Sequence, residues 1–127
     1  MEEAKIRNAL DAHWRASAAG DLDAEHDIYD DNAICEYPQS GERIVGRVSL
    51  QALRSHHPDK PSGFNVKKIQ GQGALWVTEY IISYKGRATY TVSIMEFRNA
   101  KVVHETQYFS EPFEAPGWRS QWVQQIT

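Results

Sequence analysis

The second half of the chain carries the pattern that decides its fold class. Runs of strand-forming residues follow one another there, separated by turn-forming residues. Lys85-Gly86 and Asn99-Ala100 are two-residue connections, the length of a tight hairpin turn between antiparallel strands. The expected strands span residues 64–70, 74–84, 88–98 and 101–109. Because the first half is expected to be mainly helical, the order of elements predicts an α+β domain.

The first half supplies the helical elements of this prediction. Residues 3–19 show apolar side chains at helical spacing, and Gly20 follows as a typical helix end. The other elements expected here are helices at 22–30 and 50–57, a short strand at 33–37, a loop or irregular hairpin at 39–47 and a loop at 58–63.

Composition limits the classes of function. The chain has 127 residues, and we expect one domain over residues 1–127. The net charge is -3 without a long basic run, so we expect no nucleic acid partner. We expect no membrane partner and a cytoplasmic location, because the sequence has neither a membrane-length apolar stretch nor a signal-peptide pattern. Cys35 is the single cysteine, which excludes an internal disulfide.

The central strands carry apolar residues on both faces. In residues 74–84, Trp76 and Tyr80 alternate with Leu75 and Val77. A sheet that is apolar on both sides needs two covers. The helices can cover one face, and a partner subunit or the C-terminal tail is expected on the other.

Three stretches of the sequence resemble one family. They are AAGDLDAEHDIYDDNAICEYP at residues 18–38, GERIVGRVSLQAL at 41–53 and IMEFRNAKVVHETQYF at 94–109. Together they resemble the nuclear transport factor 2-like superfamily, and more narrowly its SnoaL-like proteins and ketosteroid isomerases. At the last hairpin turn, where the family often has glycine, this chain has Ala100.

The resemblance implies a specific architecture. It implies a cone-shaped, curved antiparallel sheet packed on three N-terminal helices, the cystatin-like α+β roll, with a pocket inside the cone. It also implies a homodimer formed through the outer face of the sheet, in agreement with the two-sided strands. No cofactor is implied.

The catalytic positions of the family must be compared one by one. The ketosteroid isomerase pattern carries its general base onto Tyr37, and its two oxyanion donors onto His13 and Ser93. All three residues depart from the pattern, and a phenol is a poor proton acceptor at neutral pH. The general acid/base of the SnoaL-like cyclases falls at Gln107, which cannot transfer a proton. Glu105 lies two residues earlier and therefore points to the same face of its strand.

These comparisons and the strand alternation predict a pocket with aromatic walls. His13 and Glu105 are the candidate catalytic pair, since an imidazole near a carboxylate can transfer protons near neutral pH. The alternative for His13 is a core residue held by one hydrogen bond. The expected ligand-binding residues are Trp14, Tyr29, Tyr37, Trp76, Tyr80, Ser93, Met95 and Gln107. No metal ligands are expected, because no His, Cys or carboxylate group has metal-site spacing.

The tail after residue 110 is unusual in composition. Pro112 and Pro116 interrupt regular structure, yet Phe113, Trp118 and Trp122 are too apolar to remain in water. We expect this tail to pack back on the body or across a dimer, and closure of the pocket mouth is a further alternative.

Two functions remain open from the sequence. In the first, the protein binds a small hydrophobic organic molecule and acts on it as a cofactor-independent acid–base enzyme of the isomerase, cyclase, dehydratase or hydrolase type. In the second, it is a non-catalytic ligand-binding or dimerisation module. Loss of the family's carboxylates favours the second, and the polar groups expected in the pocket support the first.

Overall fold

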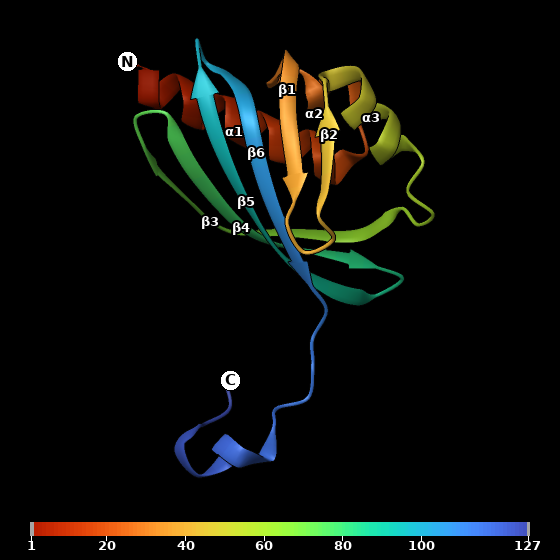
Figure 1. Cartoon of the computed structure of the whole chain (residues 1–127), viewed down its shortest axis with the longest axis vertical. Helices are drawn as coiled ribbons and strands as arrows, with labels where there is room; N and C mark the ends of the chain where they lie inside the picture. Colours follow the sequence, from red (N-terminus) through yellow and green to blue (C-terminus); the bar gives the residue numbers. More distant parts are fainter. Residues whose placement is uncertain (1, 127) are drawn as a thin grey trace.

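The computed structural model describes residues 2–126 of the chain. Its elements are α1 (Glu2–Ala19), α2 (Leu22–His26), β1 (Tyr29–Tyr37), β2 (Glu42–Val45), α3 (Arg47–Ser55), β3 (Pro61–Gln72), β4 (Leu75–Tyr84), β5 (Arg87–Arg98), β6 (Lys101–Ser110) and the 3-10 helix η1 (Gly117–Trp122). Figure 1 shows the strands as one strongly curved sheet with the helices on its inner side. The predicted α+β class and the cone-shaped roll are confirmed.

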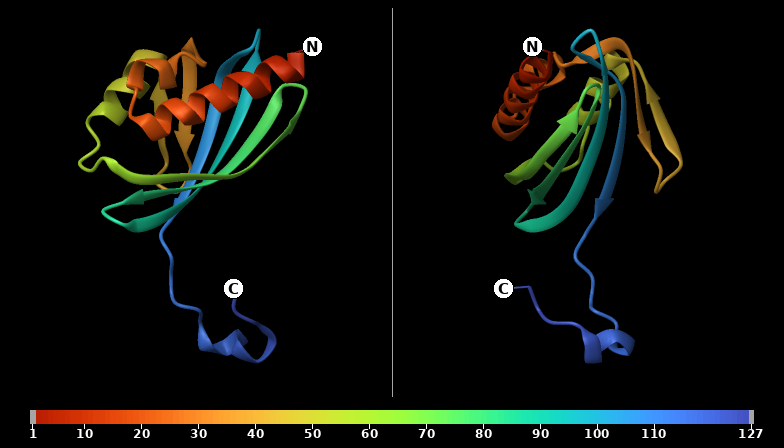
Figure 2. Two further views of the ribbon diagram at one scale, coloured as in Figure 1. Left: turned by 180° about the vertical axis from the view of Figure 1, so that it is seen from behind. Right: turned by 90° about the vertical axis from the view of Figure 1, so that its left-hand side faces the viewer.

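The strand order in the sheet is β2-β1-β6-β5-β4-β3. Neighbouring strands are antiparallel except β1 and β6, which pair in parallel. This pairing sets Cys35 opposite Glu105. The sheet is therefore mixed, and its one parallel pair joins the N-terminal hairpin to the C-terminal meander. In Figure 2, α1 crosses the concave side of the sheet and the long strands bend around it.

The two predicted hairpin turns are present. Lys85 and Gly86 have φ of 53° and 77°, and Asn99 and Ala100 have φ of 53° and 62°. Positive φ at both central residues is the geometry of a type I′ turn, which matches the twist of the flanking strands. Ala100 adopts this conformation without the freedom of a glycine, so its backbone is strained.

The ends of several elements differ from the sequence prediction. The second helix ends at His26, a turn follows at residues 27–28, and Tyr29 and Asp30 open β1 instead of completing the helix. Helix α3 begins at Arg47, three residues before the expected start at residue 50, because Gly46 with φ of 92° turns the chain directly from β2 into the helix. Strand β3 begins at Pro61, within the expected loop. Proline is tolerated there because β3 is an edge strand.

The core lies between α1 and the concave face of the sheet. Ile6 and Leu10 of α1 are fully buried. Trp76 packs flat against Gly71, where a Cβ atom would lie 2.2 Å from the indole ring. The alternation predicted for β4 is confirmed, since Trp76 is 2% exposed and Leu75 is 51% exposed. Each large apolar side chain buried in this way contributes roughly 1.5–3 kcal/mol to stability.

The chain after β6 leaves the body of the molecule (Figures 1 and 2). The aromatic side chains of Phe113, Trp118 and Trp122 are 77%, 75% and 72% exposed. The expectation that the tail packs back on the body is therefore wrong for this chain on its own. Pro112 and Pro116 explain the departure, because they remove the backbone N–H groups that would extend β6 as a ladder.

Candidate functional site

A half-open pocket of about 780 Å³ lies between the helices and the concave face of the sheet. Its walls are largely aromatic, and polar side chains gather where α1, α2 and α3 approach the sheet. The aromatic lining residues are Trp14, Tyr37, Phe64, Tyr80, Tyr84 and Phe109. The polar side chains include His13, Ser17, Glu25, Arg54, His57 and Gln107.

Three of the aromatic rings form a fixed wall. The ring centroids of Trp14 and Tyr80 are 4.4 Å apart, and Phe64 stacks on Tyr80 at 5.3 Å. Trp14 Nε1 donates a hydrogen bond to Thr78 Oγ1 at 3.2 Å, which fixes the orientation of the indole. The wall is therefore formed before any ligand arrives.

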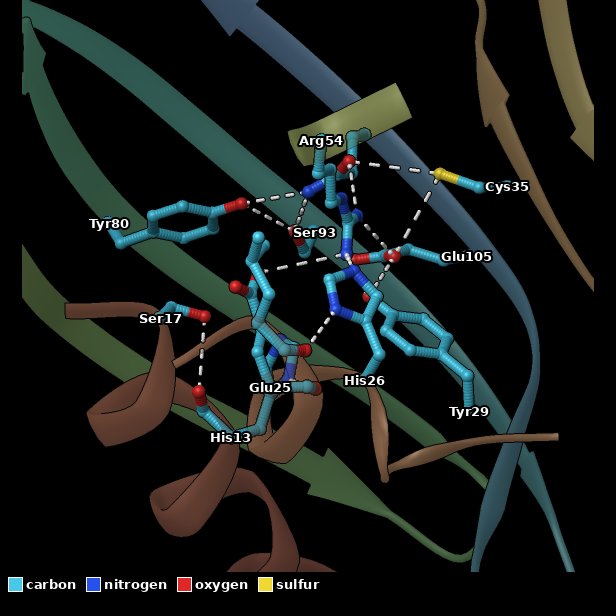
Figure 3. Close-up of polar contacts among 12 residues, drawn as sticks. His13, Ser17, Glu25, His26, Tyr29, Cys35, Arg54, Tyr80, Ser93 and Glu105 are labelled. Atoms are coloured by element: carbon cyan, nitrogen blue, oxygen red, sulfur yellow. Dashed lines mark hydrogen bonds and ion pairs between the residues drawn. The ribbon is translucent and has the colours of Figure 1, made fainter. Parts of the chain in front are cut away.

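Arg54 organises the polar groups at the base of the pocket (Figure 3). Its Nη1 donates to Tyr29 Oη at 3.0 Å and to His26 Nε2 at 3.1 Å. Its Nη2 donates to Glu105 Oε1 at 3.3 Å and to Gln107 Oε1 at 3.2 Å. We refer to these five residues as the Arg54 cluster. The cluster joins α2, α3, β1 and β6 around one guanidinium group.

Hydrogen bonds connect the Arg54 cluster to the aromatic wall. Gln107 Nε2 donates to Tyr80 Oη and to Ser93 Oγ, both at 2.9 Å. Within the cluster, Tyr29 Oη donates to Glu105 Oε1 at 2.6 Å. Because Gln107 accepts from Arg54 on one side and donates on the other, its amide orientation is determined by its partners.

His13 and His26 are each held in one neutral form. His13 Nδ1 lies 2.6 Å from the carbonyl oxygen of Glu25, and His26 Nδ1 lies 2.7 Å from that of Leu22. A carbonyl oxygen only accepts, so both Nδ1 atoms carry the hydrogen. Burial, followed by the positive charge of Arg54, lowers the pKa of His13 to about 3 and that of His26 to about 4. Both rings are uncharged at neutral pH.

Asp59 and Glu25 both line the pocket, and the carboxylate beside Arg54 is that of Glu25. Its Oε2 lies 3.9 Å from Arg54 Nη1, and its side chain is 15% exposed. Burial raises the pKa of Glu25, and the charge of Arg54 opposes this shift. Glu105, by contrast, is fully buried behind Arg54 and is not part of the pocket lining. A ligand in the pocket therefore meets Glu25 and not Glu105.

The expected pairing of His13 with Glu105 is not what the structure shows. His13 bonds to a backbone carbonyl, and Tyr29 stands between the two residues. The ring centroid of His13 lies 5.7 Å from that of Tyr29, and the Tyr29 hydroxyl donates a hydrogen bond to Glu105 Oε1. Both groups of the predicted pair are thus engaged with other partners.

The structure separates the expected ligand-binding residues into two sets. Trp14, Tyr37, Tyr80 and Gln107 line the pocket, together with His13. The others lie outside it: Tyr29 and Ser93 lie beneath its floor, and Trp76 and Met95 are in the core. Trp76 and Met95 are kept out of the pocket because the N-terminal half of α1 fills the end of the cone where they lie.

Contacts of α1 show how that end is filled. Arg7 places its guanidinium 5.1 Å from the centre of the Trp76 ring. Glu3 Oε2 accepts a hydrogen bond from the backbone N–H of Gly73 at 2.8 Å. Trp76 is consequently covered by the helix and cannot contact a ligand in the pocket.

Sequence reasoning missed Arg54 and Glu25. A signal for Arg54 was present, because it follows the fully buried Leu50 by four residues on α3 and so shares its inward face. The sequence offered no comparable signal for Glu25, which shares its short helix with Asp23. Its position depends on how α2 packs against α1 and α3.

Cys35 lies beside the Arg54 cluster as a buried thiol. It is 1% exposed, and its Sγ lies 3.8 Å from Glu105 Oε1 and 3.7 Å from Gln107 Oε1. Burial raises its pKa to about 12, so it is not a nucleophile at neutral pH. Within residues 2–126, no group of three or more His, Cys, Asp or Glu residues is arranged to hold a metal ion. No helix in that range is long and apolar enough to cross a membrane.

Comparison with solved structures identifies a protein with a closely similar sequence and others that share only the fold. A nuclear transport factor 2-like protein of unknown function from Burkholderia xenovorans is 80% identical over 100% of this chain and 99% of its own, with a TM-score of 0.91. A candidate ketosteroid isomerase from Kribbella flavida is 17% identical over 98% of this chain and 91% of its own, with a TM-score of 0.88.

The identities to the Kribbella flavida protein and to an epoxide hydrolase are below 25%, so these two structures show a shared fold alone. An LEH-like epoxide hydrolase from Mycobacterium tuberculosis is 21% identical over 84% of each chain, with a TM-score of 0.66. Neither the family models nor the curated proteins searched contain a match to the sequence. Because the Burkholderia xenovorans protein is similar over its whole length, the chain belongs to the nuclear transport factor 2-like family.

Proposed function

We propose that the protein binds a small, largely apolar organic molecule in the pocket, with one uncharged polar group directed to the base where Glu25, Arg54 and Gln107 lie. The observation that carries this proposal is the pocket itself, about 780 Å³ with six aromatic side chains in its lining. Sites for small organic molecules have volumes of roughly 300–1,000 Å³ and this mixture of apolar walls with few polar groups.

The charge balance of the Arg54 cluster supports an uncharged ligand group. Both Nη atoms of Arg54 already donate to protein acceptors, and Glu105 neutralises its charge at 3.3 Å. A ligand carboxylate or phosphate would have to displace these partners, and it would also face the carboxyl group of Glu25. A carbonyl or hydroxyl oxygen avoids both penalties.

Binding is tested with N-phenyl-1-naphthylamine, an uncharged apolar dye whose fluorescence rises in apolar sites. We expect the dye to bind the wild-type protein at one site per chain. Thr89→Phe places a ring in the pocket and is expected to weaken binding at least tenfold, because Thr89 is a lining residue. Ala88→Phe adds a larger side chain on the opposite face of the same strand and serves as the matched control. Equal affinities for the two variants would contradict the proposed site.

Acid–base catalysis is a second candidate function, favoured by the position of Glu25. Its carboxyl group lines the pocket, has a raised pKa and lies beside a fixed positive charge. A pocket carboxyl group with a raised pKa is the kind of group that enzymes use as a general acid or base. The relatives described as a candidate ketosteroid isomerase and as an epoxide hydrolase indicate which reactions to try first.

Two substrates test this second function. Cyclohex-3-en-1-one reports proton transfer from C2 to C4, and styrene oxide reports addition of water to an epoxide. If Glu25 transfers the proton, Glu25→Gln loses about 10²–10⁴-fold in rate but keeps its affinity for the dye. The surface variant Glu114→Gln is the control. Failure of the wild-type protein to accelerate either reaction would leave ligand binding as the function.

A homodimer through the convex face of the sheet completes the proposed function. The support for it is a set of exposed apolar side chains on that face: Leu75, Val77, Tyr90 and Tyr108 are 51%, 36%, 50% and 43% exposed. Monomeric proteins rarely leave such a set uncovered. The expected cytoplasmic location stays a prediction, which fractionation of cells would test.

A further inference from the structure

The segment after β6 is the least explained part of the molecule. Residues 111–126 leave the sheet at Ser110 and end in the short helix η1, away from the body in every view (Figures 1 and 2). Phe113, Trp118 and Trp122 are 72–77% exposed, and Ile126 is 102% exposed. We call residues 111–126 the C-terminal arm. Aromatic side chains of this size are normally buried against another surface.

The construction of the arm explains why it does not fold back. Pro112 and Pro116 fix φ and remove two donors, which disfavours a return of the arm as another strand of its own sheet. An ion pair of 3.1 Å between Arg87 and Glu111 holds its base at the end of β5. The arm is therefore directed outward from a defined point.

The arm begins at the end of β6, at the edge of the convex face of the sheet. Ser110, the last residue of β6, pairs with Tyr90 on β5. Tyr90 and Tyr108 are themselves exposed on this face. An arm that starts here emerges directly beside any molecule docked on the convex face.

We propose that the C-terminal arm docks on a second copy of this chain, so that the two subunits of a homodimer exchange their arms. This inference rests on the homodimer proposed above and adds a second contact to it. Around a twofold axis each subunit gives one arm and receives one, so every exposed arm finds a complementary site in the same assembly. The receiving surface is continuous with the convex face, whose exposed apolar side chains border the base of the arm.

The area that the arms can bury matches what a specific dimer requires. Three aromatic side chains remove roughly 450–750 Å² from water when they are buried. Two exchanged arms double this area, which then approaches the roughly 1,200–2,000 Å² of a specific protein interface. Exchange of the arms alone thus supplies most of a stable contact.

The charges of the arm argue against a lipid surface as its partner. Residues 111–126 contain Glu111, Glu114 and Arg119 and no other charged residue. Segments that bind anionic membranes carry clusters of Lys and Arg beside their apolar residues. An arm with more acidic than basic groups fits a protein surface better.

Accessibility of the arm tryptophans gives the direct test. Trp14 and Trp76 are 6% and 2% exposed, so quenching by acrylamide reports mainly on Trp118 and Trp122. We expect these two side chains to be protected at concentrations where the protein is dimeric and to become quenchable when dilution dissociates the dimer. Protection that does not depend on concentration would mean that the arm folds onto its own subunit, and it would overturn the proposal.

Variants of the arm give the second measurement. Trp118→Ala with Trp122→Ala is expected to raise the dimer dissociation constant at least tenfold by sedimentation equilibrium, while Gln121→Ala with Gln124→Ala leaves it unchanged. Unchanged binding of N-phenyl-1-naphthylamine by both double variants shows that the body remains folded.

The outcomes separate this inference from the function on which it rests. A dimer whose arm tryptophans stay quenchable overturns arm exchange and leaves the convex-face dimer intact. A monomer at all concentrations overturns both the dimer and the exchange. Neither result alters the dye-binding test of the pocket, which is made on each chain separately.

Discussion

Arg54 and Glu105 form an ion pair in which Nη2 lies 3.3 Å from Oε1 and the two side chains are 16% and 0% exposed. Removal of one partner from a buried pair leaves the other charge without compensation. We expect Arg54→Met to lower the free energy of unfolding by roughly 3–5 kcal/mol. Urea denaturation, followed by circular dichroism, measures the change.

The matched tests for this pair use its partner and a surface pair. Glu105→Leu in the Arg54→Met background should restore part of the lost stability, because an apolar replacement of both partners needs no compensation. Arg43→Met removes the exposed pair with Glu36 and should cost far less, since water screens that pair. Equal losses for Arg54→Met and Arg43→Met would show that the buried pair has no special role.

The two neutral histidines predict a loss of stability in mild acid. Their pKa values are about 3 for His13 and about 4 for His26 in the folded chain, below the ordinary 6.5. Between these values and pH 6.5 the unfolded chain binds more protons, so the free energy of unfolding falls as the pH falls through this window. From pH 7 to pH 5 each histidine should remove roughly 2 kcal/mol.

The slope of stability against pH checks this prediction. Urea denaturation at intervals between pH 7 and pH 5 gives the slope, which should decrease by about one proton in His13→Gln. His56→Gln alters an exposed side chain and is the control. A wild-type slope that survives in both His13→Gln and His26→Gln would show that these rings do not resist protonation.

Cys35 should be unreactive while the protein is folded. It is 1% exposed, and burial raises its pKa to about 12, so almost no thiolate is present at pH 8. Ellman's reagent is expected to react with one thiol per chain only after urea is added. Ser110→Cys places a second thiol on an exposed residue and should react at once. Fast reaction of the folded wild-type protein would contradict the buried position.

The strained turn at Ala100 predicts a stabilising substitution. Its φ of 62° lies in the left-handed region, where a residue other than glycine loses roughly 1–2 kcal/mol. Glycine adds freedom to the unfolded chain, so Ala100→Gly should gain about 0.5–1 kcal/mol net. Thermal denaturation measures the gain. Ala74→Gly, in a turn without positive φ at that residue, should give no gain.

The part of the fold that sequence could predict depended on local patterns. Alternation along β4 placed Trp76 and Tyr80 inward, because strand periodicity is a property of neighbouring residues. The early start of α3 was missed, since it depends on the positive φ of Gly46. Strand alternation alone did not show which of the inward residues line the pocket. The strands are long enough to place Trp76 beyond the pocket, at the end of the cone that α1 fills.

The candidate site was harder to predict because its contacts are not local. Family positions pointed to Tyr37 and Gln107, and both line the pocket. Arg54, however, meets partners that lie 25 to 53 residues away along the chain. Neither spacing nor composition indicates that these side chains converge. A sequence can show that Arg54 faces inward, but only the fold shows what it meets there.

The parallel pairing of β1 with β6 has a consequence for the order in which the molecule folds. It sets Cys35 opposite Glu105, and no short loop can bring strands so distant in the sequence together. Closing such a loop carries an entropic penalty before the contacts compensate it, so local hairpins are expected to form earlier. The Arg54 cluster spans this junction. A folding chain that already holds its β3–β6 meander would therefore still lack the base of its pocket, and recovery of ligand binding should be the last signal to appear during refolding.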